Sequence, residues 1–128
     1  MLYAWWRPIT AIQLADDDGN PETVGVPDWE PLLITPPYPD WPSGLSGVIG
    51  ALSATLSRLN SDGTVDLNIT STAAGVTKHY DSAAVIQEDV INARVWSGIH
   101  FHTADVVGAE MGVQVGNWAL DHYFQPTS

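Results

Sequence analysis

"WPSGLSG", residues 41–47, has the pattern of a helix start. Pro42 and Ser43 suit a helix cap, and the two glycines let another backbone or an anion approach closely. Apolar residues then recur at helical spacing, at Leu45, Val48, Ile49, Leu52, Leu56 and Leu59. This pattern predicts an amphipathic helix over residues 43–59 with one side facing a core. A leucine at position 45, the most approachable point of the turn, requires an explanation.

The segments next to this helix are a loop and a hairpin. Residues 8–15 predict a short helix that stops at "DDDGNPE", and residues 16–41 predict a long loop dense in Pro, Asp and Gly. After the helix, an Asp-Gly turn precedes an alternation of Val65, Leu67 and Ile69. This alternation predicts a strand, and "GVTKHY" returns as its partner in a small β-hairpin.

Two more helices are predicted toward the C-terminus. Helical spacing over residues 81–96 is followed by Gly98, which suits the C′ position, and Thr103 can cap a last helix to about residue 123. Small residues recur every four positions in that last helix, at Ala104, Gly108, Gly112 and Gly116. Because the segment is too polar to span a membrane, the stripe predicts close packing in a bundle. The fold class is therefore mostly α, a helical bundle with a long Pro-rich loop and a small β-hairpin.

The composition is that of one folded, acidic domain. With 128 residues, 45% of them hydrophobic, the chain is long enough for a core, which we expect its six tryptophans to fill. Fifteen acidic and four basic residues, a net charge of −11, repel nucleic acid and anionic membranes. The absence of cysteine excludes disulfides and thiolate metal sites. No signal peptide or transmembrane segment is recognisable, so we expect a soluble chain, in a compartment that composition leaves open.

The few basic residues suggest an anion site. Arg94 stands six residues before His100, which on one straight helix would turn them about 240° apart. A helix end between them lets His100 return toward the same pocket. Arg7, Arg94, His100 and the amides around Ser43 and Gly44 then indicate an oxyanion site. The alternative is that the arginines pair with carboxylates and that His100 is a core histidine.

Other constellations are weaker. His100, His102 and Asp105 are candidate metal ligands, but two histidines two positions apart are more often one buried and one exposed side chain. "GLSGV" lacks the final glycine of a nucleophile elbow. "DDDGNPE" has Pro21 where a calcium loop needs glycine. We interpret "GLSGV" and "DDDGNPE" as residues typical of loops rather than as a nucleophile elbow or a calcium site.

"WWRPITAI", "PPYPDWPSGLSG" and "ARVWSGIHFHTAD" resemble, in order, the three signature segments of the vanadium-dependent haloperoxidase and type 2 phosphatidic acid phosphatase (PAP2) superfamily. "VWSGIHF" and "LDHYF" are similar to its soluble, haloperoxidase-like branch. The resemblance runs over nearly the whole chain. It implies an all-helical bundle, in which residues 1–128 form a single domain that is the C-terminal half of a longer bundle.

The same resemblance assigns roles to the candidate residues. It implies that Arg7 and Arg94 hold the oxygens of vanadate or phosphate, with Ser43 and the Gly44 amide as further donors. It also implies that His100 bonds to vanadium in the peroxidases or attacks phosphorus in the phosphatases. The implied cofactor is therefore vanadate.

The chain departs from the family pattern at several positions. Leu45 stands where the family has its acid/base histidine, and the family's lysine would fall one position before Met1. The aspartate expected four residues after His100 is Ala104, with Asp105 one step later, which leaves the orientation of His100 open. Positions that hold serine or arginine in relatives carry other residues, at Gln13, Ala93 and His102.

These departures predict a pseudoenzyme. We expect a haloperoxidase-like or PAP2-like protein with a weak oxyanion pocket and little turnover. One alternative is a working acid phosphatase in which His102 or a loop aspartate replaces the missing acid. Another is a non-catalytic helical subunit, which self-associates or takes a partner that supplies an N-terminal half. Size distinguishes the last alternative, because a bundle cut in half exposes an apolar face.

Overall fold

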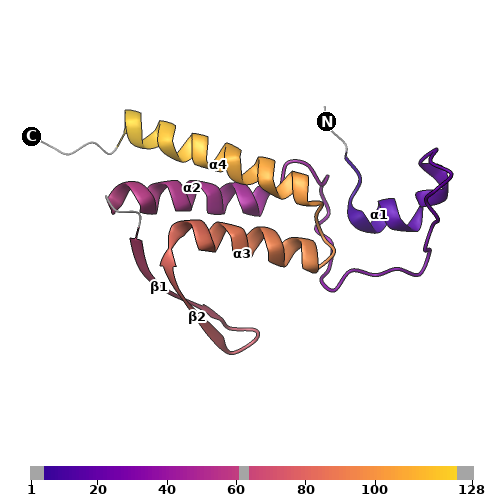
Figure 1. The fold of residues 1–128 in the computed structure, drawn as a ribbon, viewed down its shortest axis with the longest axis horizontal. Coiled ribbons are helices and arrows are strands. Elements are labelled where there is room, and N and C mark those ends of the chain that lie inside the picture. The colour runs from indigo at the N-terminus through magenta and orange to yellow at the C-terminus, as the bar shows by residue number, and fades with distance from the viewer. Residues whose placement is uncertain (1–4, 61–63, 124–128) are drawn as a thin grey trace, which may run out of the picture.

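The body of the molecule is formed by helices α2 (Gly44–Leu59), α3 (Ala83–Trp96) and α4 (His102–His122), which lie side by side with α2 in the middle (Figure 1). The structure, a computed structural model, describes residues 5–60 and 64–123. Helices α2 and α4 run in the same direction and α3 runs the opposite way (Figure 1). The mostly helical fold class is therefore confirmed. Within the described ranges, no helix has the length and apolarity that crossing a bilayer requires.

Helices α2 and α4 pack through the predicted stripe of small residues. A Cβ atom added at Gly112 would overlap the carbonyl oxygen of Gly47, and one added at Gly50 would overlap the carbonyl oxygen of Ala109. A Cβ at Gly116 would lie 3.0 Å from the carbonyl oxygen of Ala51. The two backbones therefore approach closely because the residues between them lack side chains, and the predicted packing of the stripe is confirmed.

This close contact leaves no room for large side chains between α2 and α4. The buried apolar residues are small or medium in size: Ala15, Ala54, Ala83, Ile86, Ile99, Ala104 and Ala109. The expectation that tryptophans fill the core is wrong. Trp5, Trp6, Trp96 and Trp118 are exposed, and the other two are only partly covered.

The N-terminal part lies at one end of the bundle (Figure 1). Helix α1 (Pro8–Gln13) is shorter than the predicted 8–15, because the chain tightens into a 3-10 turn at Ala15–Asp17. The predicted loop follows, and backbone hydrogen bonds fix its course. The amide of Leu32 donates to the carbonyl of Ser97 at 3.0 Å, at the end of α3. The loop ends at a cis peptide bond between Trp41 and Pro42.

The predicted hairpin is confirmed by strands β1 (Thr64–Ser71) and β2 (Val76–Ser82), which pair antiparallel and project below α3 (Figure 1). The Asp-Gly turn, at residues 62 and 63, lies outside the described residues. The helix predicted from residue 81 begins two residues later. The reason is that Ser82 stays extended to pair with Thr64, and so becomes the N-cap of α3.

The junction between α3 and α4 confirms one expectation and corrects another. Gly98 has φ of +71°, and its amide donates to the carbonyl of Val95 at 2.9 Å, as a C′ glycine should. A Cβ there would also lie 2.8 Å from the ring of Trp29. The predicted Thr103 cap is wrong, because Phe101 is the N-cap and α4 already includes Thr103.

Candidate functional site

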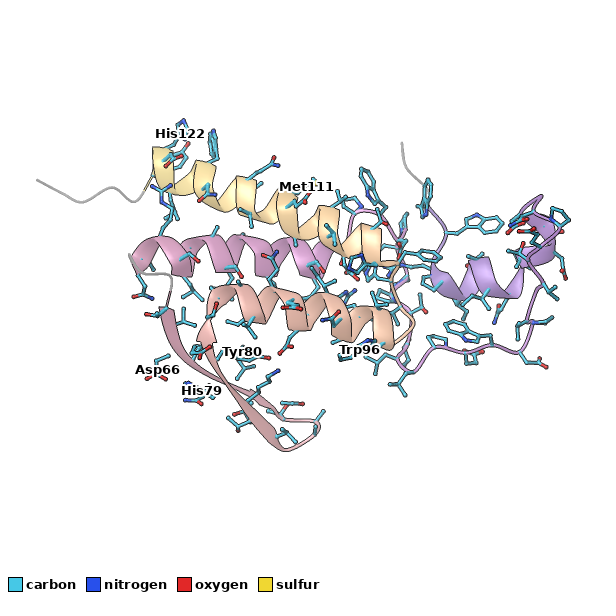
Figure 2. All side chains as sticks on the ribbon, in the orientation of Figure 1. Asp66, His79, Tyr80, Trp96, Met111 and His122 are labelled. Atoms are coloured by element: carbon cyan, nitrogen blue, oxygen red, sulfur yellow. The ribbon has the colours of Figure 1, made fainter. Side chains whose placement is uncertain are left out.

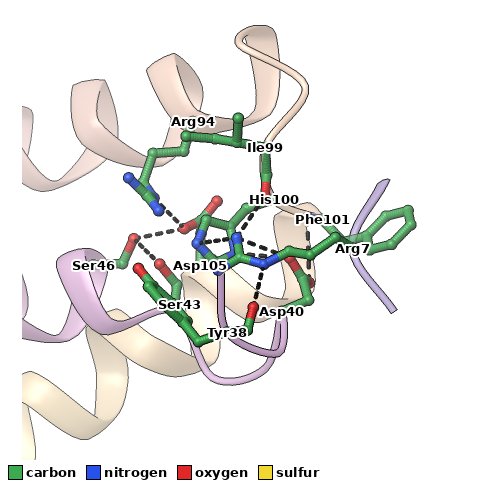
Figure 3. Close-up of polar contacts among 10 residues, drawn as sticks. All are labelled: Arg7, Tyr38, Asp40, Ser43, Ser46, Arg94, Ile99, His100, Phe101 and Asp105. Carbon is green, nitrogen blue, oxygen red and sulfur yellow. Dashed lines mark hydrogen bonds and ion pairs between the residues drawn. The ribbon is translucent and has the colours of Figure 1, made fainter. Parts of the chain in front are cut away.

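The largest fully buried side chains of the molecule are polar: His100, Asp40, Asp105, Ser43 and Ser46. They gather where the first turns of α2 and α4 meet the last turn of α3 (Figure 3). The amide of Ser43 ties the two helix starts together by donating to the carbonyl of Ala104 at 3.0 Å. Two helix N-termini, with their positive dipole ends, therefore converge on one buried polar cluster.

Arg7 enters this cluster from the start of α1 and is almost fully buried. Its Nε donates to the carbonyl of Tyr38 at 2.8 Å, and its Nη1 donates to the carbonyl of Ile99 at 2.7 Å. Its guanidinium carbon also lies 4.6 Å from the centre of the Tyr38 ring. The side chain is thus held by backbone groups from two loops.

His100 lies between a guanidinium and a carboxylate (Figure 3). Its Nε2 lies 2.9 Å from Nη1 of Arg7, and its Nδ1 lies 2.8 Å from Oδ1 of Asp40. A guanidinium can only donate, so Nε2 accepts and carries no proton. The remaining ring proton is therefore on Nδ1, beside Asp40.

A second group of polar contacts links α3, α4 and α2. Arg94, in the last turn of α3, has its Nε 3.4 Å from Oδ1 of Asp105. The hydroxyl of Ser46 donates to the same oxygen at 2.7 Å, and the hydroxyl of Ser43 donates to that of Ser46 at 3.2 Å. Ser43 is the N-cap of α2 as expected, but its hydroxyl bonds to Ser46 rather than to the helix backbone.

Both arginines keep buried donors that form no hydrogen bond within the described residues. Arg7 and Arg94 form ion pairs with Asp40 and Asp105, as the alternative interpretation required. However, Nη2 of Arg7 and both Nε and Nη2 of Arg94 are buried without a hydrogen-bond partner within residues 5–60 and 64–123. Ion pairing with carboxylates therefore does not account for all of their donors.

The remaining candidates lie closer to the surface. Gly44 is exposed, with open space where a side chain would extend. Leu45 is 44% exposed on the first turn of α2. His102 is exposed while His100 is buried, which is the second of the two interpretations of this pair. In the part of the chain that the structure describes, no cluster of three histidine or carboxylate side chains could hold a metal ion.

A cavity of about 620 Å³ opens beside the cluster, and aromatic rings form much of its wall. It is lined by Trp5, Asp40, Trp41, Phe101, Thr103 and Ala104. Of the buried polar cluster, Asp40 belongs to this wall, so the cavity lies beside the cluster.

Comparison with known proteins identifies the family. The whole chain, residues 1–128, matches the model of the VCPO second helical-bundle domain. The chain belongs to this family. The expected superfamily is thereby confirmed. Among curated proteins, none matches the chain.

Solved structures of bacterial vanadium enzymes share the fold. A bacterial vanadium-dependent iodoperoxidase is 25% identical, with a TM-score of 0.77, over 95% of this chain and 28% of its own. Bacterial vanadium-dependent chloroperoxidase, in apo and holo crystal structures, is 23% and 22% identical, each with a TM-score of 0.71 over 90% of this chain. These matches cover 30% and 29% of the chloroperoxidase chains, so this chain spans less than a third of its structural relatives.

Asp40 is the member of the cluster that sequence reasoning missed. It is the one charged residue between Glu30 and Arg58, in a stretch of otherwise apolar and small polar residues. An isolated carboxylate in such a stretch signals burial with a partner. The sequence spacing indicated Asp105 as the aspartate near His100, but the carboxylate of Asp105 contacts Arg94 and Ser46.

Proposed function

We propose that this chain carries the oxyanion pocket of a vanadium haloperoxidase-like protein and binds vanadate or phosphate weakly. The protein has the vanadium haloperoxidase-like fold. The proposed pocket consists of Arg7, Ser43, the Gly44 amide, Arg94 and His100. The observation that carries the proposal is the set of buried guanidinium nitrogens without hydrogen-bond partners.

Buried donors without acceptors are costly, by about 1–3 kcal/mol for a neutral group and more for a charged one. A tetrahedral oxyanion supplies several acceptor oxygens, and guanidinium groups match such oxygens with paired N–H bonds. The N-termini of α2 and α4 favour negative charge at the same place. The donor set of this pocket therefore fits vanadate or phosphate.

The charge balance supports weak rather than tight binding. Asp40 and Asp105 are both fully buried and stand beside Arg7 and Arg94, so two negative charges oppose two positive ones. With His100 uncharged, the cluster has a formal charge of zero. An incoming anion gains hydrogen bonds but little net Coulomb attraction.

Catalysis is impaired in this proposal because Leu45 replaces the acid/base histidine of the family. Losing a positioned acid costs a factor of about 10² to 10⁴ in rate. Vanadate, when bound, supplies the chemistry of halide oxidation by hydrogen peroxide. The chain's own residues hold the oxyanion, orient His100 and exclude water from the buried cluster.

The phosphatase alternative needs a substitute acid. His102 is exposed, and Asp40 lies on the Nδ1 side of His100, away from Nε2. Neither position favours proton donation to a group held at Nε2. A pH-rate profile with a phosphate ester tests the alternative, because a carboxylic acid and an imidazole lose their protons in different pH ranges.

Titration of the purified chain with orthovanadate, followed by vanadium NMR, tests the pocket. We expect wild-type protein and Arg58→Ala to bind, because Arg58 pairs with exposed Asp121 far along the bundle. We expect Arg94→Ala to lose binding. Absence of binding in the wild type, or unchanged binding in Arg94→Ala, would contradict the proposal.

A second variant guards against loss of folding, since Arg94→Ala leaves Asp105 buried without its cation. Arg94→Lys retains the charge but loses the planar, paired donors. We expect it to remain folded by circular dichroism and to bind vanadate more weakly than the wild type. Equal affinity would show that the guanidinium donors do not hold the anion.

A further inference from the structure

We propose that Asp40 is the positioning residue for His100, in the role for which the sequence offered Asp105. The inference rests on the proposed function, since it concerns the same pocket. It says that a loop carboxylate, two residues before Pro42, holds the imidazole with Nε2 facing the Arg7 guanidinium, where the proposed oxyanion would be held. Asp40 itself touches neither the anion nor the reacting atoms.

The geometry around Asp40 carries the proposal (Figure 3). Its side chain is 0% exposed, and Oδ1 lies 2.8 Å from Nδ1 of His100. Within the described residues, these two buried atoms meet at ion-pair distance and neither forms a hydrogen bond, with the other or with any other group. Each atom is therefore an unsatisfied polar group that faces the other, and the proposal pairs the Nδ1–H with the carboxylate.

Asp40 is itself held in place by one backbone hydrogen bond and two contacts to its carboxylate. The amide of Asp40 donates to the carbonyl of Trp5 at 3.1 Å, and the amide of Phe101 donates to Oδ2 at 3.4 Å. Nη1 of Arg7 lies 3.7 Å from Oδ1. A carboxylate fixed in this way can fix the ring beside it.

Asp105 is already engaged elsewhere. Its Oδ1 accepts from Ser46 and faces Arg94, and no contact joins it to His100 in the described structure. The two buried aspartates thus serve different partners. A carboxylate on the distal nitrogen of a ligating histidine sets the ring orientation and raises the basicity of the other nitrogen.

The first test is NMR of the protein without added anion, with ¹⁵N-labelled histidine. We expect His100 of the wild type to carry its proton on Nδ1 and to show a downfield, slowly exchanging resonance, because the acceptor is charged. In Asp40→Asn, this resonance should move upfield and exchange faster. In Asp105→Asn, the matched control, it should stay in place.

The second test compares two anions, orthovanadate and inorganic phosphate, because only vanadate is expected to bond to the imidazole. Loss of an outer carboxylate typically weakens metal affinity by about 10- to 100-fold. Asp40→Asn should therefore bind vanadate about 10- to 100-fold more weakly. It should bind phosphate at least as well as the wild type does, since a negative charge has been removed.

The outcomes separate the possible roles of Asp40. If Asp40→Asn binds both anions more weakly by the same factor, Asp40 has a merely structural role. If it binds both more tightly by the same factor, the role is purely electrostatic. Either result overturns the proposal. A wild-type His100 protonated at Nε2 also overturns it, and needs no variant. If Asp40→Asn fails to fold, Asp40→Glu is compared with the wild type instead. Because it keeps a carboxylate, it should keep the downfield resonance of His100.

Failure of the proposed function would look different. If the wild type binds neither anion while its Nδ1 resonance responds to Asp40→Asn, the oxyanion pocket is lost but the Asp40–His100 pair stands. If the anions bind and the resonance does not respond, the pocket stands and Asp40 is not its positioning residue.

Discussion

At the scale of single residues, Leu45 is the change most open to repair. It lies on the first turn of α2 and is 44% exposed, so a histidine there would be in contact with solvent. We predict that Leu45→His raises vanadate-dependent bromide oxidation or phosphate-ester hydrolysis, by up to about 10² to 10⁴ if the missing acid is the limiting defect. Initial rates of both reactions provide the measurement.

The control for this repair is Val48→His, which adds the same side chain one turn later on α2, at a residue that is more exposed. It should leave both rates at the wild-type level. A gain in both variants would point to unspecific imidazole catalysis. No gain in Leu45→His would mean that another departure from the family pattern limits the rate.

Asp89 offers a separate residue-scale prediction, away from the site. Lys78 donates a hydrogen bond to it and so holds the pKa of Asp89 below its ordinary value, with Tyr80 donating a second one at 2.9 Å. This pair contributes stability above the ordinary aspartate pKa, and the contribution is lost as pH falls through the lowered pKa. Asp89→Asn should therefore destabilise the protein slightly at pH 7 and not at all in acid.

Urea unfolding of the wild type and of Asp89→Asn, at a series of pH values, checks this dependence. The effect stays small because the pair is largely exposed and screened by solvent. Asp66, exposed on β1 with only a 3.7 Å approach to His79, provides the control as Asp66→Asn. A difference that grows toward low pH would contradict the assigned sign.

The sequence predicted part of the cluster because its members belong to ordered motifs. Arg7, Arg94, His100 and Ser43 were expected together, and the structure brings them to one end of the bundle (Figure 3). Asp40 was missed because its contact with His100 joins residues 60 positions apart, through a loop without periodicity. Only the folded loop reveals which of the two buried aspartates meets the imidazole.

At the scale of elements, the contact between α2 and α4 depends on glycine. We predict that Gly112→Ala destabilises the protein by about 1–3 kcal/mol, because its Cβ would overlap the carbonyl oxygen of Gly47 and push the helices apart. Gly44→Ala adds the same atom where nothing lies within 4 Å, and should change stability little. Thermal unfolding by circular dichroism compares the two, and similar stabilities would refute the close packing.

The sequence specified the elements well where periodicity is strong and poorly at their ends. The helix predicted over residues 43–59 agrees with α2 to within one residue. The start of α3 was missed because pairing with β1 keeps Ser82 extended, a long-range effect that local spacing does not contain. Thr103 was mistaken for a cap because its residue type suits that position, whereas the turn at Gly98 places Phe101 there.

At the scale of the whole molecule, one face of the α2/α4 pair is apolar and uncovered. Residues of this apolar face are exposed along both helices: Val48, Leu52 and Leu59 on α2, and Met111, Val115 and Trp118 on α4. Met111 lies on the side of α4 away from α3 (Figure 2). Leu59 and Val115 share a groove of about 420 Å³ between the helices. Contiguous exposed apolar surface of this kind marks an interaction site.

We expect the purified chain to self-associate through this apolar face. In a purified sample, a second copy of the chain is the protein that can bury the face. The net charge of −11 repels the copies, so association should strengthen as salt screens the repulsion. Sedimentation equilibrium at low and high salt measures both effects.

The double variant Val48→Asp and Val115→Asp should be monomeric throughout. Val24→Asp with Val76→Asp adds the same charge at exposed valines outside the face, and should associate like the wild type. A wild-type chain that stays monomeric at high salt would show that the face is tolerated in water, and would remove the main support for the interaction-subunit alternative.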